Sequence, residues 1–542
     1  MRRFVLCTLV FLLTASILRS QTETHSVPPP SVNDFTGIQS FLSSDWMEGR
    51  EADTRGGFMA ADFIASLMQL NGLLPYGDTG NIKEHRTNQP FNRSYFQDFE
   101  LIRYRVEKSS LALIKASPEG ESVLQFVPGV DFETSPVPFS LKEEASLVFA
   151  GYGIEAPGKG YDDYRGIDVR DRIVLIAAGF PGHSDTTSAA WKKLGKSFGR
   201  EFSKLSVKLR VAEKHGAKAV ILIGPEGGTE PFLPAIHNRD LINSAMNSAK
   251  PEPDYEDAEY YLPGDTGMVY IPCFSLSTGV ARLLLMGTAI DLPGFERKAA
   301  GDLLSSSMAV SGKKLRLSVE VARDAVGVRN VLGIIPGHDT GKNILIGSHF
   351  DHLGVRKGVI YNGADDNASG VSGMLALAKN WAGHPEKPSC NIIFAAWTAE
   401  EKGLLGSDWF VRHSGILSGS LSVVINMDMI SRSAPEDTLG RQLSIGTLPM
   451  NEDLKTLAKK INSHLKHPFV LDLWDVTGHT GSDYAHFAER KIPVMTFFSG
   501  FHDDYHTPRD IWSKTDPVKM EEILKIVNEC ILETSENPPA RK

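Results

Sequence analysis

From about residue 314 onward, the chain alternates short segments that are apolar along almost their whole length with longer amphipathic ones. The pattern predicts strands at 328–335, 343–348, 391–397 and 421–427, and helices at 371–381, 453–465 and 518–532. Strands that are apolar throughout are buried on both faces, which is typical of parallel sheets covered by helices on each side. We therefore expect an α/β fold with a mixed, largely parallel β-sheet sandwiched by helices. In such folds ligands bind beyond the carboxyl ends of the strands.

The region before residue 312 divides into two parts. Residues 33–75 contain two amphipathic helical patterns. The middle of the chain holds a strand–helix–strand unit of its own, which ends with the apolar strand 219–223. We therefore predict an N-terminal part of the main domain at 32–125, an inserted smaller α/β domain at 126–311, and the catalytic part of the main domain at 312–535.

The N-terminus has the pattern of an export signal. Two arginines precede an apolar run over residues 4–18, which then becomes polar. A membrane-spanning helix needs about 20 apolar residues, so this run fits a cleaved secretory signal better than an anchor. We expect a signal peptide at 1–20, a Pro- and Ser-rich linker at 21–31, and a secreted or periplasmic protein with no other membrane contact.

The composition excludes several classes of protein. The 542 residues include 57 basic and 66 acidic side chains, with a formal net charge of −9 and no basic stripe, so no nucleic acid is expected as a partner. Hydrophobic residues make up 42% of the chain, which excludes a disordered protein. Four cysteines are too few for a disulfide scaffold, and we expect Cys273, Cys390 and Cys530 to be buried, unpaired thiols.

Acidic and imidazole side chains follow the predicted strands of the carboxy-terminal part. His349 closes the strand 343–348, and Asp351 lies two residues later, on the same side of an extended chain. A carboxylate beside an imidazole can fix the tautomer of a metal-bound histidine. Asp365 and Asp366 lie between small residues before a predicted helix. A helix cap would account for one of these two acids but not for both.

Three further motifs complete the set. Glu400 and Glu401 directly follow the strand 391–397, and two adjacent carboxylates there repel each other unless a cation lies between them. Asp428 follows the strand 421–427, and His506 lies in a loop after another apolar run. Each motif alone could be an ordinary solvated group. Together, two imidazoles and three carboxylates form a ligand set suited to a pair of Zn²⁺ ions.

The motifs SHFDHLG, GADDNASG, WTAEEKGLLGS, INMDM, GSDYAHF and YHTPRD occur in this order. With them, the chain resembles the di-zinc exopeptidase family that includes aminopeptidases S and Y and glutamate carboxypeptidase II. The resemblance covers about 312–535 and the helices of 33–75 with their LSSDWMEGR segment. The middle, about 126–311, resembles the protease-associated (PA) domain that is often inserted in this family, including its GYGI and DVRDRIVLI stretches.

The resemblance implies two Zn²⁺ ions per chain and a role for each ligand. Asp366 would bridge both ions. His349 and Asp428 would complete one zinc site, and Glu401 and His506 the other.

The resemblance also implies three catalytic residues. Glu400 would be the general base that takes a proton from a zinc-bridging water, Asp351 would orient His349, and Tyr505 would donate to the oxyanion. His352 is interpreted as surrounding structure. The sequence has Tyr484 where many relatives carry a histidine, so the details of the nearby substrate pocket differ.

These roles predict a secreted aminopeptidase that acts on peptides. The first alternative is a carboxypeptidase or dipeptidase with the same metals, for which Arg432 and Arg509 are candidate ligands of a substrate carboxylate. A glutaminyl cyclase is less consistent with the GADDNASG loop. The alternative of another class is a receptor or binding module without chemistry, although such relatives lose metal ligands and this chain retains all five. The sequence leaves the oligomeric state and the preferred substrate side chain open.

Overall fold

The computed structural model describes residues 27–79, 93–117, 120–135, 137–202, 204–224, 258–265, 271–415 and 419–539. The predicted signal peptide and most of the predicted linker lie outside these residues. No helix of the described ranges is long and apolar enough to cross a membrane. Cys273, Cys390 and Cys530 are buried and unpaired, as expected.

The chain forms two compact units. The first comprises Met1–Glu100 and Gly327–Lys542, and the second comprises Leu101–Val326. The second unit begins earlier in the sequence and ends later than the predicted insertion 126–311. The long strands β2 (Phe96–Ser117) and β12 (Met308–Ile335) contribute most of their length to it, which accounts for the difference. The assignment of the middle segment as a PA domain stays a prediction.

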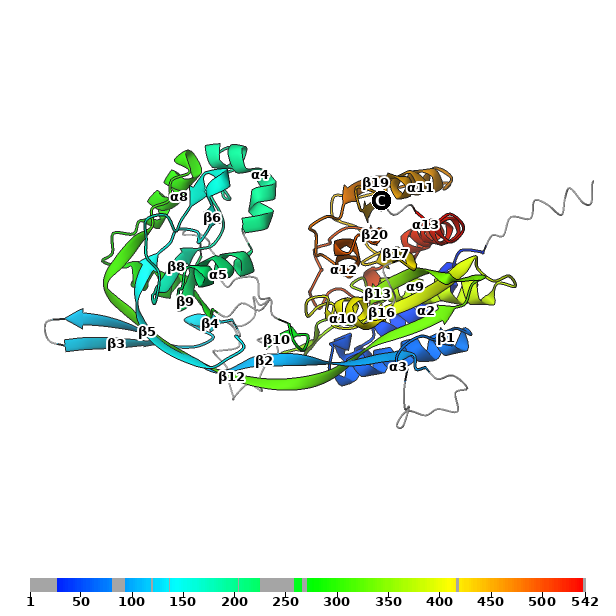
Figure 1. The fold of residues 1–542 in the computed structure, drawn as a ribbon, viewed down its shortest axis with the longest axis horizontal. Coiled ribbons are helices and arrows are strands. Elements are labelled where there is room, and N and C mark those ends of the chain that lie inside the picture. The colour runs from blue at the N-terminus through cyan, green and yellow to red at the C-terminus, as the bar shows by residue number, and fades with distance from the viewer. Residues whose placement is uncertain are drawn as a thin grey trace, which may run out of the picture. The chain divides into compact units, whose positions relative to one another are not determined.

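A mixed sheet forms the centre of the first unit (Figure 1), and its strands run in the order β19-β18-β20-β17-β13-β16-β12. Their bounds are Val470–Asp475, Gln442–Thr447, Val494–Phe498, Leu421–Met427, Asp339–His349, Cys390–Trp397 and Met308–Ile335, and β1 (Leu74–Pro75) pairs with β12. Strand β13 is parallel to both of its neighbours, β16 and β17, and β17 is parallel to β20. Strand β12 is antiparallel to β16. The predicted fold class is confirmed.

Helices cover both faces of this sheet because its central strand is apolar on both sides. Ile344 and Ile346 of β13 pack into one hydrophobic cluster, whereas Leu345 between them packs into another. The first cluster includes helices α2, α3, α9, α11 and α13, which span Val32–Leu42, Arg55–Leu70, Ala368–Gly383, Glu452–Ser463 and Pro517–Glu536. The second includes α10 (Leu405–His413) and α12 (Tyr484–Glu489).

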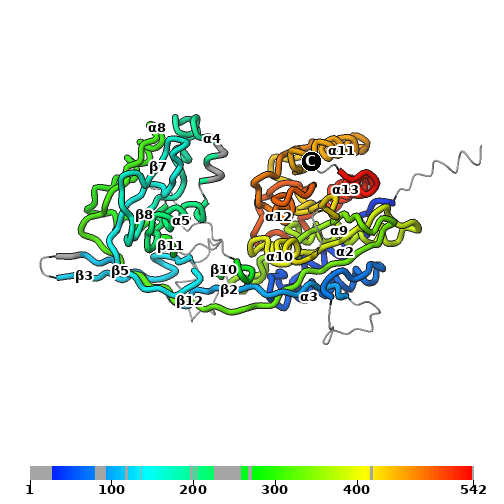
Figure 2. The backbone as a smooth tube through the Cα atoms, in the orientation of Figure 1, coloured from blue at the N-terminus to red at the C-terminus, as the bar shows by residue number. Residues whose placement is uncertain are grey.

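The first and last helices of the described residues meet within the first unit. Helix α2, near the N-terminus, contacts helix α13, near the C-terminus (Figure 2). The side-chain amide of Asn528 in α13 donates to the carbonyl oxygen of Val27 at 2.7 Å. A 3₁₀ helix, η1 (Asp45–Arg50), follows α2 and packs against the short hairpin of β14 (Gly354–Arg356) and β15 (Val359–Tyr361). The N-terminal segment is therefore an integral part of this unit.

The second unit contains a smaller sheet in the order β12-β5-β8-β9-β11-β4. Strands β5, β8, β9, β11 and β4 span Leu141–Phe149, Ile173–Ala177, Ala219–Ile223, Cys273–Leu276 and Phe132–Thr134. Helices α4, α5, α7 and α8 span Ala189–Phe202, Leu205–Lys214, Thr278–Leu285 and Leu292–Asp302. This unit also contains the strands β3 (Gly120–Phe126), β6 (Glu155–Ala156), β7 (Tyr161–Asp162) and β10 (Ala258–Tyr261) and the 3₁₀ helix η2 (Pro157–Lys159). A further 3₁₀ helix, η4 (Trp512–Lys514), belongs to the first unit. The predicted strand–helix–strand unit corresponds to β8, α5 and β9.

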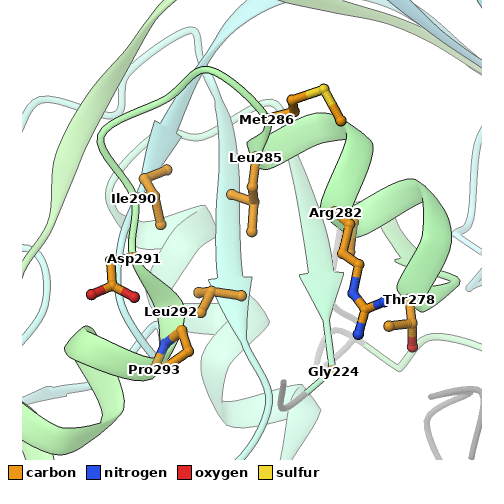
Figure 3. Close-up of a pocket in the computed structure, with 10 residues that line it drawn as sticks. Gly224, Thr278, Arg282, Leu285, Met286, Ile290, Asp291, Leu292 and Pro293 are labelled. Carbon is orange, nitrogen blue, oxygen red and sulfur yellow. The ribbon is translucent and has the colours of Figure 1, made fainter. Parts of the chain in front are cut away.

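A pocket of about 430 Å³ lies in the second unit between α7 and the start of α8 (Figure 3). Its walls are mainly apolar, with Leu285, Ile290 and Leu292, and Arg282 and Asp291 add one charge of each sign. None of the predicted metal ligands or catalytic residues lines it.

Candidate metal centre

The predicted ligands lie at the carboxyl ends of adjacent parallel strands. His349 is the last residue of β13, and Asp428 directly follows β17. Glu400 and Glu401 follow β16 after a short turn. Because β13 is parallel to both neighbours and lies between them, these side chains emerge at the same edge of the sheet.

Asp366 connects two groups of side chains. Its Oδ1 atom lies 3.3 Å from Nε2 of His349, and its Oδ2 atom lies 3.0 Å from Nε2 of His506. The same nitrogen of His349 is 3.3 Å from Oδ1 of Asp428, and that of His506 is 3.2 Å from Oε2 of Glu401. The structure thus brings all five predicted ligands together in two sets that share Asp366.

The donor set fits metal ions. Tetrahedral zinc binds imidazole nitrogen and carboxylate oxygen at about 2.0–2.1 Å, so two ligand atoms of one ion lie roughly 3.3 Å apart. The four separations above, from 3.0 to 3.3 Å, agree with that spacing. Ligand atoms of His352, Asp366, Glu401 and His506 lie within 4.8 Å of one another, as do those of His349, Glu400 and Asp428. These residues could hold two metal ions.

The electrostatic field at the site favours cations. Burial opposes a proton on His349, yet the carboxylates of Glu400 and Asp428 raise its pKa well above the usual value. Burial likewise opposes ionisation of Asp366, but hydrogen bonds from His349 and His506 outweigh it and lower the pKa of Asp366. The pKa of His506 rises to about 10, because Glu401 and Asp366 overcome the effect of burial. A field that retains protons on imidazoles in the metal-free protein also attracts a divalent cation.

Glu400 lies beside the predicted ligands, but its carboxylate is farther from His349 than those of Asp366 and Asp428. Its Oε2 atom is 4.0 Å from Nε2 of His349, and its side chain is 12% exposed. Burial and the charges of Glu401, Asp428 and Asp483 raise its pKa well above the usual value. A carboxylate with an increased proton affinity at the edge of the metal site suits a general base.

Asp351 is fully buried, but its carboxylate is 3.8 Å from Nδ1 of His349. The nearer partner of that nitrogen is the backbone carbonyl of Asp351, at 3.1 Å. The carboxylate instead accepts the backbone N–H groups of Glu400 and Glu401, at 3.1 and 3.3 Å. The contacts of Asp351 therefore extend to the loop that carries the two glutamates.

Tyr505 stacks on the imidazole of His506, with ring centroids 3.8 Å apart. Phe501 also packs edge-on against the tyrosine, with ring centroids 4.9 Å apart. Burial and the nearby carboxylates, Asp366 first among them, raise the pKa of Tyr505. Its hydroxyl therefore remains a hydrogen-bond donor at neutral pH.

Arg50 is a buried residue that sequence reasoning missed. Its guanidinium donates to the backbone carbonyls of Phe350 at 2.8 Å, Asn362 at 2.7 Å, Gly363 at 2.9 Å and Leu42 at 2.5 Å. It thereby connects the loop after His349 with the loop before Asp366. The LSSDWMEGR segment contained this residue, but nothing local to that segment indicates a partner 300 residues away.

Asp510 was likewise quoted only as part of the motif YHTPRD. Its carboxylate accepts the backbone N–H groups of Asp365, at 3.0 Å, and of Asp366, at 3.0 Å. It thus holds the backbone of the proposed bridging residue. His352, predicted as surrounding structure, lies close enough to the second ligand set to be a candidate ligand, with its Nδ1 atom 2.8 Å from Oε1 of Glu401.

The two arginines proposed for a substrate carboxylate have other partners. Arg432 donates to Asp504 at 2.8 Å, and Arg509 donates to the same carboxylate at 2.7 Å. Lys514 also contacts Asp504 at 2.8 Å. The pKa of Asp504 is lowered, because these cations outweigh its burial. The structure therefore pairs both arginines with a carboxylate of the chain itself.

The chain is similar in sequence to known peptidases. The model of peptidase family M28 matches residues 330–531. The leupeptin-inactivating enzyme 1 of Streptomyces exfoliatus is 29% identical over 206 residues, which cover 38% of this chain and 43% of that protein. The glutamate carboxypeptidase 2 homolog of Caenorhabditis briggsae is 31% identical over 245 residues, 37% of this chain and 29% of that protein. The chain thus spans less than half the length of these two curated relatives.

Solved structures share the fold over nearly the whole chain. An aminopeptidase from Aneurinibacillus sp. strain AM-1 matches 96% of this chain and 97% of its own, with a TM-score of 0.57 and 18% identity. BSAP, a zinc aminopeptidase from Bacillus subtilis, matches 93% of this chain and 96% of its own, with a TM-score of 0.52 and 20% identity. At these identities the likeness establishes the fold alone.

Proposed function

Because residues 330–531 belong to peptidase family M28, we propose that the protein is a zinc-dependent aminopeptidase that removes N-terminal residues from peptides. The observation that carries the proposal is the position of Asp366, whose two oxygens face two different imidazoles. A carboxylate in this position can bridge two ions. The proposal includes export of the protein through the segment 1–20 and peptides as its partners.

Two zinc sites follow from the two ligand sets. His349, Asp366 and Asp428 would hold one ion, and Asp366, Glu401 and His506 the other. When bound, such ions would polarise the scissile carbonyl group and lower the pKa of a bound water molecule from 15.7 toward about 7.

The chain itself supplies the proton transfers. The carboxylate of Glu400 takes the proton of the attacking water and passes it to the leaving amine, and its raised pKa suits a group that both accepts and returns a proton. Asp351 holds the backbone of Glu400 and Glu401 through two hydrogen bonds. The hydroxyl of Tyr505 donates to the oxyanion that develops on the carbonyl oxygen when water attacks the carbonyl carbon.

The charge of the site supports recognition of an amine over recognition of a carboxylate. Six carboxyl groups gather there: Asp351, Asp366, Glu400, Glu401, Asp428 and Asp483. Those that bind no zinc can accept hydrogen bonds from the α-ammonium group of a peptide. A carboxypeptidase would need a cation for the terminal carboxylate, and Arg432 and Arg509 are already paired with Asp504.

A set of blocked peptides tests the proposal. We expect hydrolysis of peptides with a free α-amine whether or not the carboxyl terminus is amidated, and no hydrolysis after acetylation of the amine. Cleavage that requires a free terminal carboxylate would instead establish a carboxypeptidase. A protein that binds zinc but cleaves no peptide of either kind would favour the binding-module alternative.

A further inference from the structure

His352 lies three residues after His349 and is fully buried. Its ring packs edge-on toward the ring of His506, with centroids 5.7 Å apart. On another side it lies against Gly363, where an added Cβ would come within 2.6 Å of its ring atoms. Its Nδ1 atom is 2.8 Å from Oε1 of Glu401 and 3.8 Å from Oδ2 of Asp366. The imidazole is therefore confined among the three loops that carry Asp366, Glu401 and His506, the ligands of the second zinc set.

Two roles are compatible with this position, and the distances separate them. If His352 and Glu401 bound the same zinc through these atoms, the two atoms would lie roughly 3.3 Å apart. The observed 2.8 Å is shorter and is typical of a direct N–H···O hydrogen bond. The pairs assigned as ligands are all farther apart, from 3.0 Å for His506 with Asp366 to 3.3 Å for His349 with Asp366 and with Asp428.

We propose that His352 is a positioning residue, whose Nδ1–H donates to Oε1 of Glu401 and leaves Oε2 as the atom that binds the second zinc. The proposal rests on the metal centre of the proposed function. Oε2 of Glu401 already faces His506, so the carboxylate is held between two imidazoles with different tasks. A hydrogen bond to the oxygen that does not bind the metal restricts rotation of the carboxylate.

The other ring nitrogen of His352 agrees with this tautomer. Nε2 is buried and has no hydrogen-bond partner among the residues that the structure describes. An N–H group there would be an unsatisfied buried donor, which costs more than an unpaired acceptor nitrogen. The geometry therefore assigns an N–H group to Nδ1, where Glu401 accepts it.

Two substitutions separate a hydrogen-bond donor from a metal ligand. His352→Leu removes the donor and keeps an apolar side chain. In His352→Asn the amide nitrogen can occupy nearly the place of Nδ1 and donate to Glu401. In the matched control, His352→Gln, the amide nitrogen lies nearer the place of Nε2. The measurement is zinc binding by the full-length metal-free protein in competition with a chelating dye, with thermal unfolding of each metal-free variant as the control for folding.

We expect His352→Leu to weaken one of the two zinc-binding steps by about 10–100-fold, the usual effect of losing such a partner, and to leave the other step unchanged. His352→Asn should restore most of the lost affinity, and His352→Gln should not. Two normal binding steps in His352→Leu would overturn the inference, as would an Asn variant as weak as the Leu variant. If the unchanged protein binds no second zinc, the metal centre and this inference are both wrong.

Discussion

Glu400→Gln should separate catalysis from metal binding. Its Oε2 atom is 4.0 Å from Nε2 of His349, whereas the assigned ligands Asp366 and Asp428 approach the same nitrogen to 3.3 Å. Ligand atoms on one tetrahedral zinc lie roughly 3.3 Å apart, so Glu400 lies outside that spacing. We therefore expect the variant to retain both zinc ions. The glutamine amide keeps the size of the side chain but cannot accept a proton.

Loss of general-base catalysis typically decreases the rate about 10²–10⁴-fold, which corresponds to about 2.7–5.4 kcal/mol in the activation barrier. The decrease should appear in kcat, with little change in KM, since Glu400 is assigned no contact with the rest of the substrate. The assay is hydrolysis of a chromogenic aminoacyl anilide, with zinc content measured on the same preparation. The matched variant Glu401→Gln should behave in the opposite way, with lower zinc content and partial recovery in excess zinc. A Glu400→Gln protein that loses zinc, beside a Glu401→Gln protein that keeps zinc and activity, would refute the assignment.

Three other outcomes follow from the same structure. Asp366→Ala should lose both zinc ions and Asp428→Ala mainly one. Elemental analysis of the purified variants measures their zinc content, and an Asp366→Ala protein that loses no more zinc than Asp428→Ala would contradict a bridging Asp366. Arg50→Met should lower the free energy of unfolding of the metal-free protein by at least about 3 kcal/mol, because four buried carbonyls lose a charged donor; an unchanged urea midpoint would contradict this. Burial lowers the pKa of Lys208 to about 8 against an unperturbed 10.5, so the unfolded chain binds more protons between these values. The free energy of unfolding should therefore rise by up to about 3 kcal/mol from pH 8 to 10.5 relative to Lys208→Met, and parallel curves for the two proteins would exclude it.

Local patterns predicted the elements that carry the site. Helix α9 was predicted at 371–381 and spans Ala368–Gly383, with Asn367 accepting the N–H of Gly370 as its cap. The strand 421–427 has its predicted bounds. Such patterns are readable because side-chain periodicity and capping depend on neighbours within a few residues. Four of the five proposed ligands could be found for the same reason, since each lies at or just beyond an apolar strand or in a loop after one, whereas Asp366 was singled out by the small residues around it before helix α9.

The boundaries of the second unit could not be predicted in this way. Strand β12 is far longer than the apolar run 328–335 that predicted it, and its preceding part, in which polar residues are frequent, lies in the second unit. Continuation of a strand through polar sequence depends on a pairing partner, and β12 pairs with β5 there. That partner lies more than a hundred residues away in the sequence and leaves no local signal.

The sequence by itself therefore determined the fold class and which side chains stand at the ends of the parallel strands. Only the tertiary structure decided how these side chains are held. Arg50 contacts the loops after His349 and before Asp366, Asp510 binds the backbone of Asp366, and the nitrogen of His352 reaches Glu401. These contacts join residues between 49 and 313 positions apart. Periodicity and propensity act over a few residues, whereas the partner of a buried polar group depends on how the whole chain packs around it.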